Sequence, residues 1–178
     1  AYIYRAEWTD CKKAPFVHIF PYWDFIEGQL IDVRVTTNAP RVELFLNGEK
    51  VAEKDIDHIS GTELTLNTQL EYKKGELLAV AYDENGNEIA RDVQRSFGDT
   101  SELRLSTEND VVYANGEDII FLDIAAYDSE GNFVANANNR AFVTVEGEGR
   151  LIGLDNGDST DYEQYKGTSR RLFSGRLL

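Results

Sequence analysis

The chain has 178 residues, of which 42% are hydrophobic and 11% aromatic, an ordinary composition for a folded protein. Its formal net charge is -14, from 32 acidic against 18 basic residues. Such a surface repels phosphate backbones and anionic lipid, so we expect neither nucleic acid nor a membrane as a partner. The single cysteine, Cys11, excludes an internal disulfide and a cysteine-rich metal site.

Strand patterns dominate the chain after its first few residues. The opening AYIYRAEW is the one stretch in which apolar side chains recur at a helical spacing. After it, apolar and polar residues alternate, and Asn47-Gly48 and Asn85-Gly86 supply pairs that tolerate positive φ between two such runs. The expected strands and hairpins cover residues 29–37, 41–55, 76–93, 119–135, 141–147 and 150–155.

An internal echo indicates how these strands are grouped. Residues 79–90 and 123–135 share a strand, a Tyr-Asp pair, a Gly-Asn pair and a second strand. They are either neighbours in one sheet or equivalent hairpins in two sandwiches. The small and polar residues 96–101 favour a linker between two bodies, each near the size of an immunoglobulin-like domain. We therefore predict an all-β chain with two consecutive immunoglobulin-like β-sandwich domains, residues 1–97 and residues 101–178.

The stretch FVHIFPYWDF, residues 16–25, concentrates aromatic rings. On an extended strand His18 and Phe20 share one face, and Val17 and Ile19 share the other, which indicates a strand covered on both sides. A buried seam between neighbouring parts is one interpretation. A platform on which sugars stack is the other. The residues that would make either contact are Trp8, His18, Tyr22, Trp23 and Phe25.

No residue pattern in the chain specifies catalysis or a cofactor. The many carboxylates fix no pair across a cleft, so we expect no catalytic residue. The segment DNGDSTDYE offers Asp155, Asp158 and Asp161 as calcium ligands, but its glycine stands third, whereas an EF-hand loop has glycine at the sixth position. A tight turn with Asp and Asn as backbone caps is the favoured interpretation, and no metal is expected.

Two ordered strings resemble glycoside hydrolase family 2. The strings are WTDCKKAPFVHIFPYWDF and DVRVTTNAPRVELFLNGEKVAEKD, and they are similar to the first β-sandwich after the catalytic barrel in β-galactosidase-like members. Tyr22, Asp24 and Phe25 stand where that family has His, Asn and Trp. The matching residues are Trp8, Thr9, Asp10, His18, Pro21, Trp23, Asn38 and residues 42–48.

The later part of the chain, from NGEDIIFLDIAAYDSEG to RLIGLDNGD, resembles the next sandwich of the same enzymes. The resemblance implies a non-catalytic accessory region whose partner is the parent's catalytic barrel. A sugar-binding module is the alternative. Residues 1–12 resemble the exit from that barrel, and SGRLL resembles the start of a final strand. Tyr2, Tyr4 and Trp8 are then expected to be exposed. Because members of the family are frequently exported, the resemblance also implies a periplasmic or extracellular parent protein.

Overall fold

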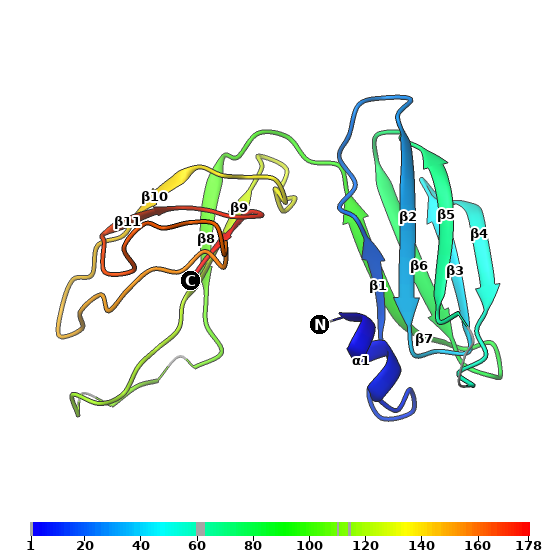
Figure 1. Ribbon diagram of the computed structural model, residues 1–178, viewed down its shortest axis with the longest axis horizontal. Helices are drawn as coiled ribbons and strands as arrows, with labels where there is room; N and C mark the ends of the chain where they lie inside the picture. The colour runs from blue at the N-terminus through cyan, green and yellow to red at the C-terminus, as the bar shows by residue number, and fades with distance from the viewer. Residues whose placement is uncertain (1, 60–62, 110, 114) are drawn as a thin grey trace. The chain divides into compact units, whose positions relative to one another are not determined.

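The computed structural model describes residues 2–59, 63–109, 111–113 and 115–178. It divides into two compact units, Ala1–Ser96 and Phe97–Leu178, which are taken separately below (Figure 1). Within the described residues the structure is all-β apart from one helix, α1 (Tyr2–Trp8), which confirms the predicted fold class and the helix at the start. No helix in these ranges is long and apolar enough to cross a membrane.

The first unit is a sandwich of two antiparallel sheets, whose strands are labelled in Figure 1. One sheet has the order β1-β2-β5 and the other has the order β4-β3-β6-β7. The strands are β1 (Val17–Phe20), β2 (Leu30–Thr37), β3 (Arg41–Leu46), β4 (Glu49–Asp55), β5 (Thr65–Glu71), β6 (Glu76–Tyr82) and β7 (Glu88–Arg95).

The core of this sandwich follows from the alternation in sequence. Every second residue of β2 and of β3 is buried, so each sheet turns one apolar face toward the other. The β3–β4 turn is the predicted one, because Asn47 and Gly48 take φ values of 52° and 85°. Asn47 also accepts the backbone N–H of Glu76 at 2.8 Å and so joins this turn to β6.

The second unit carries less regular structure. One sheet has the order β12-β9-β8, and a separate pair joins β10 to β11. The expected return strand after residue 131 is reduced to a single bridge between Tyr127 and Phe133, and residues 150–155 carry no strand. These two predictions were wrong because the backbone bonds there run singly to separate partners, such as Leu154 N–H to Tyr165 O. The strands are β8 (Glu102–Ser106), β9 (Asp123–Tyr127), β10 (Arg140–Phe142), β11 (Ser169–Arg171) and β12 (Arg176–Leu177).

The sequence echo corresponds to one turn built twice, once in each unit. Asp83 N–H donates to Asn87 O at 2.9 Å, and Asp128 N–H donates to Asn132 O at the same distance. In both turns the Asp carboxylate accepts the backbone N–H groups two and four residues later. The Asp and Asn side chains therefore hold each turn, which explains why the same residue types recur at residues 83–87 and 128–132.

Candidate interaction site at helix α1

Helix α1 lies on the outer face of the β1-β2-β5 sheet and packs against β2. Ala6 is its buried residue, at 2% exposure. The Tyr2 ring stacks on His18, with centroids 3.9 Å apart, and on Phe16 at 6.1 Å. The Arg5 guanidinium lies 4.5 Å from the centroid of the Phe16 ring. The ring of Phe16 and the outward rings of β1 thus form the surface against which the helix packs.

Asn38 ties the end of α1 to the sandwich. Its side chain, only 5% exposed, accepts the Phe16 N–H at 2.9 Å. Its amide also donates to Thr9 Oγ1 and to Ala14 O, both at 2.9 Å. Asn38 and Thr9 belong to the two strings that resemble the glycosidases, and the structure places them in direct contact. Sequence reasoning did not single out Asn38 as a structural residue.

His18 and Asp92 close the sandwich along one edge. His18 Nδ1 lies 3.0 Å from Asp92 Oδ2, and the backbone N–H of Ile19 donates to the same oxygen at 2.8 Å. Burial alone would raise the pKa of Asp92, but these hydrogen bonds outweigh it and hold the pKa below its usual value. Since β1 and β7 belong to different sheets, Asp92 links the sheets where their edges meet. His18 is therefore a structural partner in a ring cluster.

Trp23 packs into the hydrophobic core of the first unit. The side chain is fully buried, and its indole N–H donates to Lys73 O at 3.0 Å. Its ring centroid lies 5.3 Å from that of Tyr72 and 6.4 Å from that of Phe25. Because the indole N–H is already hydrogen-bonded, full burial of the ring is favourable. The buried ring therefore offers no face to a sugar or to a neighbouring domain. Tyr22 and Phe25 stack on each other at 5.2 Å and remain half-buried.

Trp8 and Tyr4 form the exposed side of α1. Trp8 is 77% exposed and Tyr4 is 61% exposed, and their ring centroids lie 5.0 Å apart. Tyr2 is 46% exposed despite its contacts with β1. The exposure expected for these three residues is observed. Two adjacent rings facing solvent, on a helix anchored by buried contacts, make an exposed apolar surface.

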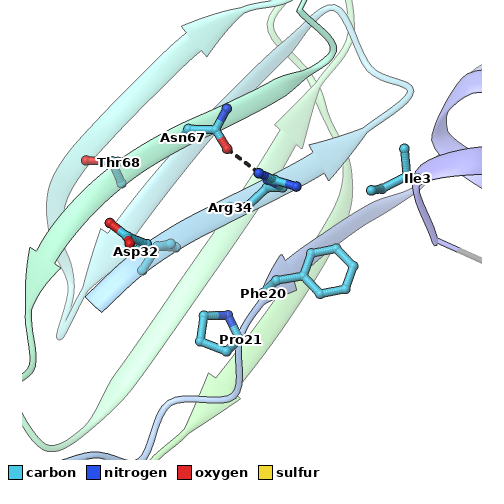
Figure 2. A pocket seen from close by; sticks show the side chains of 8 residues that line it. Ile3, Phe20, Pro21, Asp32, Arg34, Asn67 and Thr68 are labelled. Carbon is cyan, nitrogen blue, oxygen red and sulfur yellow. Dashed lines mark hydrogen bonds between the residues drawn. The ribbon is translucent and has the colours of Figure 1, made fainter. Parts of the chain in front are cut away.

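A pocket of about 760 Å³ lies beside α1 on the same sheet face (Figure 2). Among its lining residues, Arg34 Nε donates to Asn67 Oδ1 at 2.9 Å, and Asp32 Oδ1 accepts a hydrogen bond from the neighbouring Gln69 at 3.0 Å. The pocket therefore presents polar side chains beside apolar ones, and it extends the α1 surface across the sheet. Its lining consists of Ile3, Phe20, Pro21, Asp32, Val33, Arg34, Asn67 and Thr68.

The three calcium candidates of the second unit serve as caps. Asp155, Asp158 and Asp161 each accept the backbone N–H two residues later, at 2.9, 2.9 and 2.8 Å. Asp161 also pairs with Arg170 Nε at 3.0 Å, and Arg170 is only 1% exposed. Across the described residues no group of three or more His, Cys, Asp or Glu is gathered as metal ligands. The three hydrogen bonds to backbone N–H groups are those of a turn capped by Asp side chains.

Comparison with known proteins follows the same division of the chain. Residues 103–178 match the model described as glycoside hydrolase family 2 C-terminal domain 5. Residues 28–90 match a domain of unknown function, DUF4982. The β-galactosidase BoGH2A of Bacteroides ovatus is 33% identical over 99% of this chain and 20% of its own length. A putative β-glucuronidase of Formosa agariphila is 28% identical over 98% of this chain and 17% of its own length.

Two solved glycosidase structures are also similar to this chain. A β-glycosidase from Bacteroides vulgatus superposes with a TM-score of 0.89 at 29% identity, over 98% of this chain and 22% of that one. A family 2 member from Bacteroides cellulosilyticus superposes with a TM-score of 0.83 at 28% identity, over 99% and 26%. The fold and these matches define the C-terminal β-sandwich region of a glycoside hydrolase. Residues 103–178 thus match a domain of glycoside hydrolase family 2, and the chain spans about a fifth of the length of the curated relatives it matches.

Proposed function

We propose that this chain is a non-catalytic accessory region of a longer β-galactosidase-like enzyme, and that helix α1 is its contact with the catalytic barrel. The observation that supports this role is the exposed Tyr4–Trp8 ring pair on a helix whose opposite side is anchored to the sandwich. At about 25 cal/mol per Å² of apolar surface, covering two such rings contributes several kcal/mol to docking. The relatives match over only about a fifth of their length, which leaves room for a separate catalytic domain.

Binding to a separately produced catalytic barrel tests this role. Calorimetric titration of the intact chain should show association, and Trp8→Ser should weaken it about tenfold or more, because a central aromatic anchor contributes strongly to an interface. Tyr162→Ser is the matched control, since Tyr162 is 98% exposed in the other unit and lies far from α1 in sequence. Equal affinities for Trp8→Ser and the intact chain would remove α1 from the interface.

Sugar binding is the second candidate, and the stacked Tyr22–Phe25 pair is the observation in its favour. The burial of Trp23 weakens it, because the largest ring of the stretch is enclosed. Titration with galactosides while following tryptophan fluorescence separates the two roles. A change at millimolar sugar that Tyr22→Ser abolishes would favour sugar binding, whereas an accessory role predicts no change. We also propose a periplasmic or extracellular location for the parent, which cell fractionation tests.

A further inference from the structure

Residues 119–122 form an apolar run, Ile-Ile-Phe-Leu, that lies outside every strand of the structure. All four side chains are exposed, at 57%, 37%, 66% and 38% along the run. Four consecutive large apolar side chains in water are costly, and such a surface marks a site that another segment covers. A run that is apolar on both faces is typical of a strand covered from both sides.

The neighbouring strands indicate the direction in which a segment covering this run would lie. The run leads directly into β9, which β8 and β12 flank, and in Figure 1 it is part of the green limb that enters β9. β12 is antiparallel to β9, with Arg176 opposite Ala125 and Leu177 opposite Ile124. A strand that kept this register beyond Leu178 would lie opposite residues 122, 121, 120 and 119 in turn.

The exposure of the run also fixes which of its sides faces the core. Ile124 and Leu177 are buried, at 6% and 1% exposure, and they occupy opposed positions on the core face. Side chains alternate along a strand, so Ile120 and Leu122 share that face with Ile124. They are indeed less exposed than Ile119 and Phe121. The partner strand must therefore place an apolar side chain opposite Leu122 and another opposite Ile120.

We propose that the open edge beside residues 119–122 takes up an extended β-strand that runs on from β12 in a longer chain. This strand is antiparallel to the run and carries apolar side chains at alternate positions, beginning with the residue directly after Leu178. Continuity with the β12–β9 pairing selects this occupant over a second copy of the chain, which would have to enter without that register. The inference stands apart from the α1 contact, because the two surfaces share no residue.

Two extensions of the chain test the proposal. Three Val-Thr repeats after Leu178 place valine on the core face, whereas three Thr-Val repeats, of identical composition, place threonine there. Hydrogen exchange of residues 119–122 should slow about tenfold or more with the first extension and much less with the second. Binding of a hydrophobic dye should fall in the same order. Protection of residues 123–127 in every form shows that the unit remains folded.

Equal exchange of residues 119–122 in all three chains, with residues 123–127 protected, would overturn the proposal. Equal protection by both extensions would also overturn it, because the core-face register would then have no role. A third contradicting result is protection of the unextended chain that rises with protein concentration. With a dimer seen by sedimentation, that result would identify a second copy as the occupant.

Discussion

Replacing Asp128 by alanine should destabilise the second unit selectively. The Asp128 side chain is only 4% exposed, and its carboxylate accepts three backbone N–H groups. The donors are Gly98 at 2.8 Å, Glu130 at 3.0 Å and Asn132 at 2.7 Å. Truncation to Ala leaves all three N–H groups without their acceptor. At about 1 kcal/mol for each hydrogen bond, the expected loss is about 3 kcal/mol.

The pKa of Asp128, which the same hydrogen bonds lower, gives a second magnitude for their effect. Burial would raise this pKa, but the hydrogen bonds to the carboxylate outweigh burial and lower it from 3.8 to about 2. One pKa unit corresponds to about 1.4 kcal/mol, so ionised Asp128 contributes about 2 kcal/mol to the unfolding free energy of the unit. Because the folded pKa lies below the unfolded one, this contribution is present above about pH 4 and is lost as the pH falls toward 2. Asp128→Asn should lack that part of the pH dependence.

Hydrogen exchange followed by mass spectrometry measures the effect on residues 98–132. Both tryptophans lie in the first unit, so tryptophan fluorescence during urea unfolding serves as an internal control. Asp83→Ala is the matched variant, because Asp83 holds the equivalent turn but accepts no bond from a remote segment in the described structure. Unchanged exchange in Asp128→Ala, or an equal loss of stability in the first unit, would refute the reasoning.

Three further substitutions follow from buried polar contacts. Asn38→Ala should lower the unfolding free energy of the first unit by about 2 kcal/mol, since it leaves buried groups unpaired, whereas the exposed Asn67→Ala should cost much less in urea denaturation. Asp92→Asn should destabilise the same unit near neutral pH, because the lowered pKa of Asp92 makes its ionised form stabilising above the pKa of the unfolded chain. The variant should therefore lose less stability than the intact chain when the pH falls. Thermal unfolding across pH values checks this. Arg170→Leu should lower the unfolding free energy of the second unit by about 3 kcal/mol, because it leaves Asp161 without its buried partner. Faster hydrogen exchange near residue 161 would show this loss. Unchanged exchange there would mean that the ion pair is dispensable.

The first sandwich could be predicted from sequence because its signals are local. Alternation along β2 and β3 assigns the buried face, and Asn47-Gly48 fixes the turn between two strands. Helix α1 was also expected from the spacing of its apolar side chains. Each of these features depends on residues close together in the chain, so no tertiary contact is needed to infer it.

The site was harder to predict, because its decisive contacts join distant segments. Trp23 is enclosed by Tyr72 and by the carbonyl of Lys73, about 50 residues later, and the pattern within residues 16–25 does not indicate these partners. Asn38 acts through bonds to residues more than 20 positions away. Residues 119–122 have the composition of a strand, yet a strand forms only beside a partner, and the described residues provide none there.

Quenching of Trp8 by acrylamide tests the proposed contact of α1 most directly. The Trp8 signal is isolated by subtracting the spectrum of a Trp8→Phe variant, first in this chain and then in the longer enzyme. The exposed ring should be strongly quenched in the chain alone and protected in the enzyme, because the catalytic barrel would cover it. Equal quenching in both proteins would contradict the account and leave α1 as a surface helix with no partner.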